Sequence, residues 1–352
     1  MSKELVLVTG GTGLIALHCI KECFSQGFTV RTTIRSESKK DAIMDSLKRA
    51  GIPSEHLDQL QFTVADLLQD DGWNAAVEGC TYILHVASPF PENMNPSDEN
   101  ELIAPARDGT LRVLKAAKAA GTVKRVVVTS SIAAVCYGIT PSNQNGLFTE
   151  EDFTDENSPS FNNAYVKSKT IAEKAAWEYI RGEGVGLEMA TVNPAAVFGP
   201  PLRPDGNSTT IGMVEKLLDG SLPAVPRLRL SLVDVRDVAT LHLLAMTKPE
   251  AANQRYIAVA SSTSFSFMDM CNVLRTKLGD RAQNLPTREI PDWLTRILSY
   301  VVPMMKSLKG EIGQDRRFSN QKALDLGWNP KSPEESLTSA AEAVLAFKEE
   351  KK

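Results

Sequence analysis

The sequence predicts an α/β fold, in which a doubly wound parallel sheet is covered by helices on both faces. The chain opens with a short apolar run, a glycine-rich turn and a helical pattern within residues 5–16. Short segments rich in β-branched residues then alternate with longer amphipathic segments, which is typical of βαβ units. This alternation continues to about residue 199, where proline-rich loops replace it.

Length, charge and cysteine content narrow the class of protein. The 352 residues suit one large domain, or a nucleotide-binding domain with a smaller partner. A net charge of −4 gives no indication of binding to nucleic acid or to an anionic membrane. Five cysteines without a CxxC pair indicate a reducing compartment. We therefore expect a cytoplasmic protein, and the sequence does not choose between a monomer and a homodimer.

Neither a signal peptide nor a membrane span is expected. The first predicted strand begins almost at the N-terminus, which leaves no room for a signal peptide before it. The most apolar late stretch, residues 297–305, is nine residues long and contains a proline. A membrane span needs about 20 residues. We interpret this stretch as a core or lid helix.

The first strand, residues 5–8, ends at the glycine-rich turn. Gly10 can adopt backbone angles that a Cβ would forbid, and Gly13 would allow the backbone to approach a pyrophosphate. The helix predicted at residues 14–25 then offers free N–H groups to phosphates. A plain tight turn can have the same glycines. A Rossmann-type dinucleotide site therefore needs support from later segments.

The predicted second strand, residues 28–34, ends at Arg35, 22 positions after Gly13. An NAD enzyme of this fold usually has an acid near this point, bonded to the ribose 2′-hydroxyl. Here the basic side chains of Arg35, Lys39 and Lys40 suit a 2′-phosphate, which favours NADP. The alternative is a solvated basic start of the next helix, residues 39–50.

Small and polar residues follow the next two predicted strands, residues 61–64 and 82–86. Asp66 could accept the adenine amino group or cap the following helix, and the two roles are compatible. Ala87 follows the other strand, where a cofactor passes in this fold. His85 lies within the apolar strand, so we expect a core histidine rather than a base.

The segments between residues 99 and 181 contain a pair of serines, a tyrosine and a lysine that could act together. A helix at residues 99–120 precedes the strand at 125–129, which ends in Ser130 and Ser131. After a surface loop at 141–159, a helix at 163–181 places Tyr165 and Lys169 on one face, since they are four residues apart. That spacing alone is weak evidence. Its position, one element after the serine pair, is the stronger observation.

These groups suit the reduction of a carbonyl, which needs a hydride, a proton and a group that stabilises the oxyanion. NADPH would supply the hydride. Tyr165 could supply the proton, although a free tyrosine has a pKa of about 10. Lys169 would lower that pKa and could hold the ribose hydroxyls, while Ser131 could donate a hydrogen bond to the carbonyl oxygen. No metal is needed.

The last part of the chain contains the predicted domain boundary. A strand at residues 188–192 leads to Pro194 and then to proline-rich loops. We expect residues 1–199, with parts of 230–262, to form the NADP-binding domain that holds the catalytic residues. Residues 200–352 would mainly form a smaller α/β substrate-binding region. The charges at residues 234–237 are interpreted as a helix cap and a structural ion pair before a helix at 238–246.

Together these segments resemble the extended short-chain dehydrogenase/reductase family, and within it the dihydroflavonol-reductase-like branch of NADPH-dependent aldehyde and ketone reductases. The matching segments are residues 9–16, 35, 66–67, 85–89, 128–131, 165–169, 193–200, 233–239 and 326–328. In that family the second serine is catalytic, which favours Ser131 over Ser130. Leu14 stands where Phe is common, and Ala16 replaces a third glycine.

The resemblance also implies which residues contact cofactor and substrate. The expected cofactor contacts are Gly10, Thr12, Gly13, Leu14, Ile15, Arg35, Lys39, Asp66, Leu67, Ala87, Tyr165, Lys169, Pro194, Val197 and, in a loosely aligned loop, Ser208. The candidate pocket walls are Phe90, Ile132 and Tyr137, which could equally be core residues.

Three functions remain possible from the sequence. The leading hypothesis is an NADPH-dependent carbonyl reductase acting on small-molecule aldehydes and ketones. A nucleotide-sugar epimerase or dehydratase of the same family is the second, and the absence of an acid at Arg35 counts against it. The third is a regulator that binds NADP without turnover, and the complete set of Ser131, Tyr165 and Lys169 counts against that.

Overall fold

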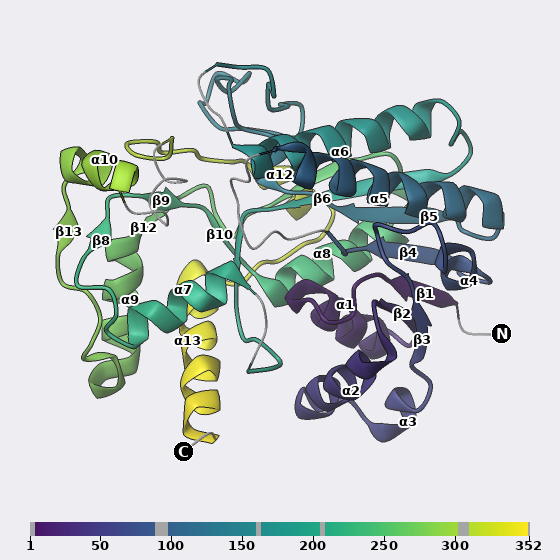
Figure 1. The fold of residues 1–352 in the computed structure, drawn as a ribbon, viewed down its shortest axis with the longest axis horizontal. Coiled ribbons are helices and arrows are strands. Elements are labelled where there is room, and N and C mark those ends of the chain that lie inside the picture. The colour runs from purple at the N-terminus through teal and green to yellow at the C-terminus, as the bar shows by residue number, and fades with distance from the viewer. Residues whose placement is uncertain (1–3, 89–97, 160–162, 205–207, 302–309, 351–352) are drawn as a thin grey trace.

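A seven-stranded parallel sheet forms the centre of the computed structural model, as the sequence predicts (Figure 1). The structure describes residues 4–88, 98–159, 163–204, 208–301 and 310–350. The strand order is β11-β6-β5-β4-β1-β2-β3, and every neighbouring pair is parallel. Its strands are β1 (Leu5–Val8), β2 (Thr29–Ile34), β3 (Gln61–Val64), β4 (Tyr82–His85), β5 (Arg125–Thr129), β6 (Glu188–Pro194) and β11 (Arg255–Ala258). The order reverses between β1 and β4, and there a doubly wound sheet opens its cleft.

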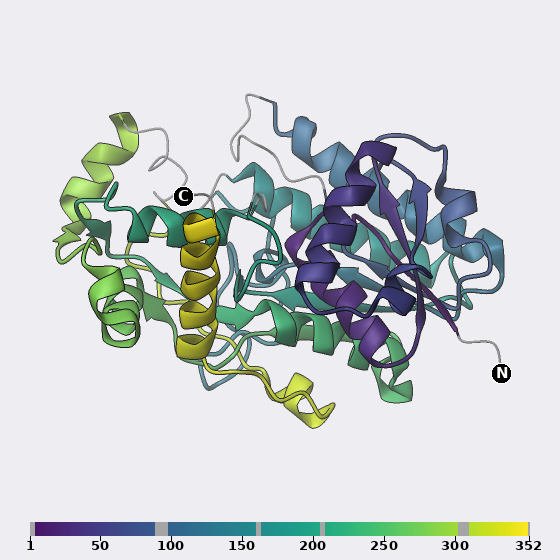
Figure 2. The ribbon, with the colours of Figure 1, turned by 90° about the horizontal axis from the view of Figure 1, so that it is seen from below.

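Helices cover both faces of this sheet (Figures 1 and 2). On one face lie α1 (Leu14–Ser25), α2 (Lys40–Arg49) and α8 (Val235–Thr247), and on the other α4 (Trp73–Val77), α5 (Asn100–Ala120) and α6 (Ala164–Arg181). In β1, Val6 and Val8 pack on the first face and Leu7 on the second. This alternation explains why a strand buried on both faces is continuously apolar.

The remaining elements of the part that contains the seven-stranded sheet are short. They are α3 (Ser54–Leu57) and the 3₁₀ helices η1 (Glu37–Lys39) and η2 (Ile132–Ala134). Most predicted bounds agree with the structure to within one residue. Two differ by more: β6 extends to Pro194, because it pairs with β11 up to Ala258, and α8 begins at Val235.

The C-terminal part has its own apolar cluster, built mainly on α7 (Thr209–Leu218), α9 (Phe267–Leu278) and α13 (Pro333–Glu350). Three two-stranded sheets accompany it. The other elements are β7 (Ala196–Phe198), β8 (Val225–Pro226), β9 (Arg229–Leu230), β10 (Leu232–Asp234), β12 (Phe265–Ser266), β13 (Glu289–Ile290), α10 (Asp292–Val301), α12 (Gln321–Asp325), η3 (Pro249–Ala251) and η4 (Gly279–Ala282). The domain boundary at residue 199 stays a prediction.

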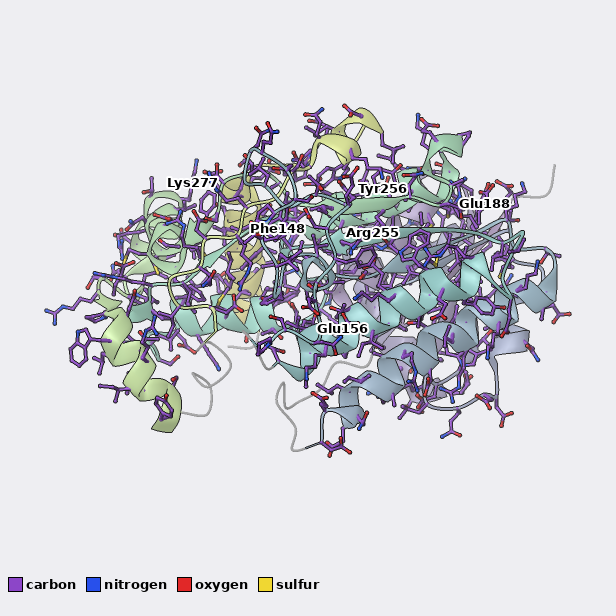
Figure 3. The ribbon with its side chains drawn as sticks, turned by 90° about the horizontal axis from the view of Figure 1, so that it is seen from above. Phe148, Glu156, Glu188, Arg255, Tyr256 and Lys277 are labelled. Atoms are coloured by element: carbon purple, nitrogen blue, oxygen red, sulfur yellow. The ribbon has the colours of Figure 1, made fainter. Side chains whose placement is uncertain are left out.

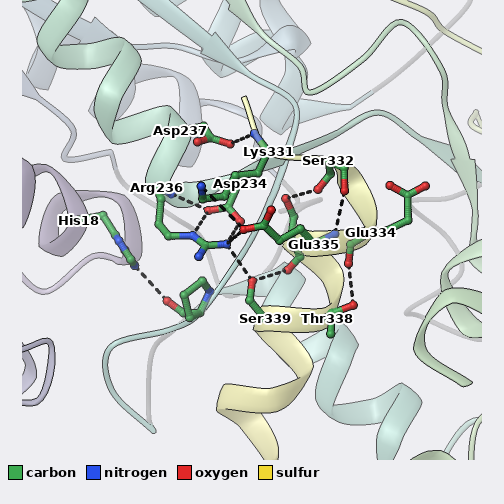
Figure 4. A network of polar contacts seen from close by, with 12 residues as sticks. His18, Asp234, Arg236, Asp237, Lys331, Ser332, Glu334, Glu335, Thr338 and Ser339 are labelled. Atoms are coloured by element: carbon green, nitrogen blue, oxygen red, sulfur yellow. Dashed lines mark hydrogen bonds and ion pairs between the residues drawn. The ribbon is translucent and has the colours of Figure 1, made fainter. Parts of the chain in front are cut away.

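A polar network ties the C-terminal helix α13 to the end of β10 and the start of α8 (Figure 4). Asp234 caps α8 by accepting a hydrogen bond of 2.8 Å from the backbone N–H of Arg236, and its carboxylate pairs with the Arg236 guanidinium at 2.7 Å. The same guanidinium donates to Ser339 Oγ on α13 at 3.2 Å. The predicted helix cap and structural ion pair at residues 234–237 are therefore confirmed.

The apolar stretch at residues 297–305 is helical where the structure describes it, within α10, but it is not a core helix. Ile297 is 55% exposed, and Trp293 and Tyr300 on the same helix are also exposed. The core interpretation was wrong because apolar composition does not reveal that one face of α10 is turned to solvent. Residues 302–305 lie outside the described residues. Across the described residues, no helix has the length and apolar character that crossing a membrane requires.

Candidate active site

The glycine-rich turn lies between β1 and α1 and requires glycine at Gly10. Its φ is +71°, and a Cβ there would come within 3.0 Å of the Cβ of Ala87. The Gly10 N–H donates to Thr33 Oγ1 at 2.9 Å, which ties the turn to β2. Gly13 is the N-cap of α1 and has no side chain to cap the helix. The N–H groups of the first turn are therefore left to a ligand or to water.

The end of β4 is held against this turn by a buried hydrogen-bond pair. Thr9 Oγ1 accepts a hydrogen bond of 2.9 Å from the Ala87 N–H and lies 3.0 Å from His85 Nδ1. Burial lowers the pKa of His85 to about 3, so this imidazole is neutral at physiological pH. The prediction that His85 is a core histidine is confirmed.

The predicted adenosine-binding residues lie at the ends of β2 and β3. Arg35 and Lys39 are exposed, and they flank Ser36, whose hydroxyl accepts from the Ser38 N–H at 3.4 Å. The Asp66 carboxylate accepts from the Leu68 N–H at 3.0 Å, so it stabilises a turn rather than capping a helix. That bond occupies one oxygen only. The contacts of these residues with a cofactor stay predictions.

Ser131 and Tyr165 meet at the carboxyl end of β5. Ser131 is the N-cap of η2, where its hydroxyl accepts from the Ala133 N–H at 3.1 Å. Asn163 caps α6 by accepting from the Val166 N–H at 3.2 Å, which fixes the helix start at Ala164, one residue before Tyr165. The side chains of Ser131 and Tyr165 are hydrogen-bonded. Burial raises the pKa of Tyr165, and the bond to Ser131 opposes this rise.

Lys169 lies one turn after Tyr165, with its Nζ 5.8 Å from the centre of the tyrosine ring. The ammonium donates to Ser88 Oγ at 2.9 Å. Burial lowers the pKa of Lys169 to about 8. The lysine can therefore change charge near physiological pH, close to the phenol. The structure thus brings together all three residues that the sequence predicts to be catalytic.

The other described candidates have different surroundings. Ile132 and Tyr137 pack against the apolar core, and the guanidinium of Arg316 lies 4.2 Å from the Tyr137 ring centre. Phe90 lies outside the described residues. Ser208 is the N-cap of α7, where its hydroxyl accepts from the Ile211 N–H. Pro194 ends β6 and Val197 lies within β7.

Two polar residues at this site were missed by sequence reasoning. Thr33 holds the glycine turn, and Ser88 accepts the Lys169 hydrogen bond. Ser88 follows a strand end, which is where this fold places functional groups, so its position was a usable signal. Thr33 lies within β2 and gave no signal, because only pairing with β1 brings it to the turn.

Comparisons with known proteins show which proteins this chain resembles. Residues 6–260 match the NAD dependent epimerase/dehydratase family. The chain is 36% identical over 252 residues to cinnamoyl-CoA reductase CAD2 of Medicago truncatula (71% of this chain, 74% of that protein). It is 32% identical over 304 residues to the ketoreductase azaE of Aspergillus niger (82% and 86%). The crystal structure of the yeast methylglyoxal/isovaleraldehyde reductase Gre2 complexed with NADPH superposes with a TM-score of 0.78 at 26% identity (98% and 99%).

Proposed function

The chain belongs to the NAD dependent epimerase/dehydratase family, in the branch of dihydroflavonol-reductase-like and cinnamoyl-CoA-reductase-like NADPH-dependent reductases, and we propose that it reduces an aldehyde or ketone to an alcohol with Tyr165 as proton donor. The observation on which this rests is the hydrogen bond between Ser131 and Tyr165, one helical turn from Lys169.

The described residues fit NADPH. The uncapped first turn of α1 and the positive φ of Gly10 leave backbone N–H groups for the pyrophosphate. Arg35 and Lys39 are exposed cations at the end of β2, suited to a 2′-phosphate. Gre2, which was solved with NADPH, supports the same cofactor here. When bound, NADPH supplies the hydride to the carbonyl carbon.

The side chains of this protein then act on the carbonyl oxygen. Ser131 donates a hydrogen bond to that oxygen and Tyr165 transfers its phenolic proton to it as the negative charge develops. The ammonium of Lys169 favours the resulting phenolate, which burial alone would make costly. The Ser131 hydroxyl is hydrogen-bonded to the phenol, so the two hydroxyls lie side by side. Its single proton would turn from the phenol to the carbonyl oxygen when the substrate binds.

The test is NADPH oxidation with a panel of aldehydes and ketones, for the wild type and for Tyr165→Phe. The variant keeps the ring and loses only the hydroxyl, so any rise in the Kd for NADPH should be much smaller than the fall in kcat. Removing the proton donor should lower kcat by at least about 100-fold. Equal turnover by the two proteins would refute the proposed role of Tyr165. If NADPH binds but no carbonyl is reduced, the reductase proposal itself fails.

A further inference from the structure

A buried carboxylate lies behind the three candidate catalytic residues. Glu173 follows Lys169 by four residues and Tyr165 by eight, so the three share one face of α6. The Glu173 side chain is fully buried. An ionised carboxylate in such a place is costly unless charge and hydrogen bonds compensate it. The groups that offset the cost of burying the Glu173 carboxylate therefore indicate what this residue does.

Five donors from four elements meet this carboxylate. Arg255 Nε on β11 and Asn193 Nδ2 on β6 each donate at 2.7 Å. The hydroxyl of Ser130, directly after β5, also donates to it. The other two donors are Trp177 Nε1 on α6 at 3.2 Å and Thr191 Oγ1 on β6 at 3.4 Å. Thr191 shares its single proton with Asn193 Oδ1, which lies closer, at 3.0 Å. Glu173 thus joins α6 to three neighbouring strands of the sheet.

Two of these five donors connect Glu173 to the candidate catalytic serine. Ser130 precedes Ser131 directly, so a bond that fixes the first also fixes the backbone of the second. Asn193 Nδ2 donates to the carbonyl oxygen of Ser131 at 3.2 Å as well as to Glu173. The peptide around Ser131 is therefore held from both sides by groups that meet at one carboxylate.

Arg255 supplies the opposite charge from a fixed position in the interior, where Figure 3 labels it. Its guanidinium donates to the carbonyl oxygen of Asp152 at 2.8 Å and lies 3.6 Å from the ring centre of Phe153. The guanidinium cannot follow Glu173 if the glutamate moves, because these contacts hold it. The ion pair therefore fixes α6 relative to β11.

We propose that Glu173 is a positioning residue, whose carboxylate holds Ser130 and Asn193 so that Ser131 stays hydrogen-bonded to Tyr165. This inference rests on the proposed reductase function. Glu173 touches neither substrate nor cofactor in this proposal, and it acts only through Ser131. A misplacement of about 1 Å at a reacting group can cost roughly 100-fold in rate, so such a role can be measured.

The experiment is a double-mutant cycle with Glu173→Gln and Ser131→Ala. Glutamine has the same shape, but it replaces an acceptor oxygen by an N–H₂ group, so one or more of the donors loses its partner. In the wild-type background we expect kcat to fall about 10- to 100-fold. In the Ser131→Ala background, where the positioned hydroxyl is already absent, the same change should lower kcat by less than about threefold.

Trp177→Phe is the matched control. It removes another donor to the same carboxylate, but this donor comes from the next turn of α6 and does not touch the Ser131 peptide. We expect a lower Tm, because the variant loses a hydrogen bond of about 1 kcal/mol and part of a buried ring. The kcat should stay within about twofold of wild type, because the Ser131 peptide keeps its contacts with Asn193. If Glu173→Gln does not fold, Ser130→Ala removes a single hydroxyl and replaces it in the cycle.

Two results would overturn the inference. The first is an additive cycle, in which Glu173→Gln lowers kcat by the same factor with and without the Ser131 hydroxyl, since a merely structural role gives that result. The second is a crystal structure of Glu173→Gln in which Ser131 and Tyr165 keep their hydrogen bond. The crystal structure tests the positioning role of Glu173 even if the wild type reduces no carbonyl. A wild type that reduces no carbonyl would refute the proposed reductase function, which is a separate result.

Discussion

The charge of Lys169 should control the alkaline side of the pH profile. Burial lowers the pKa of this lysine to about 8. A group with that pKa is about 90% protonated at about pH 7 and about 10% protonated at about pH 9. If only the ammonium favours the Tyr165 phenolate, kcat/KM for NADPH should fall about tenfold between these pH values, since this constant reports the free enzyme.

Lys169→Arg separates this titration from others in the protein. A guanidinium stays charged throughout this range, so the fall should disappear below about pH 9 even if the variant is slower at every pH. The assay is NADPH oxidation at saturating carbonyl, from about pH 6 to 10. A wild-type profile that is flat to about pH 9, or the same fall in Lys169→Arg, would refute the reasoning, because the titrating group would then be another one.

Three further predictions concern cofactor choice, the glycine turn and acid stability. Arg35→Asp should shift the ratio of kcat/KM for NADPH and NADH by about 100-fold towards NADH, because lost charge-assisted bonds are worth about 1.5–3 kcal/mol. Lys115, which is also exposed, serves as the control. An unchanged ratio in Arg35→Asp, or an equal shift in Lys115→Asp, would contradict the prediction. Gly10→Ala should raise the Kd for NADPH by more than about tenfold, since the new Cβ would meet Ala87 at the end of β4. Gly27→Ala should leave the Kd unchanged, because Gly27 also has a positive φ but a Cβ there would have no atom within 4 Å. Equal Kd values in the two variants would exclude the close approach as the cause. Burial lowers the pKa of His242 from 6.5 to about 4. Between these two pH values the unfolded chain binds more protons than the folded one, so the free energy of unfolding falls as the pH decreases. The loss should be about 3 kcal/mol from about pH 7 to 4. Urea unfolding of His242→Gln should show a loss smaller by about that amount, and an identical pH dependence would disprove this assignment.

The local pattern of the chain predicted most of the sheet. The bounds of α1, β3 and β5 agree with the structure, because each is a short periodic run bounded by glycine or polar residues. The register between β6 and β11 could not be predicted, since it depends on pairing between residues far apart in the sequence. The amino-acid composition could not predict that Ile297 is exposed, because the burial of a side chain depends on what packs against its helix.

The sequence by itself determined which residues are candidates for the chemistry. Three of these candidates follow strand ends: Gly10, Arg35 and Ser131. The other two, Tyr165 and Lys169, share a helix face. Such positions depend only on local periodicity. The tertiary structure alone decided which polar groups contact or surround those candidates. Thr33 accepts from Gly10, Ser88 accepts from Lys169, and Glu173 accepts from Arg255. The two residues of each pair are far apart in the sequence, and only the folded sheet brings them together. Burial then requires every polar group to find a partner, and local sequence does not name that partner.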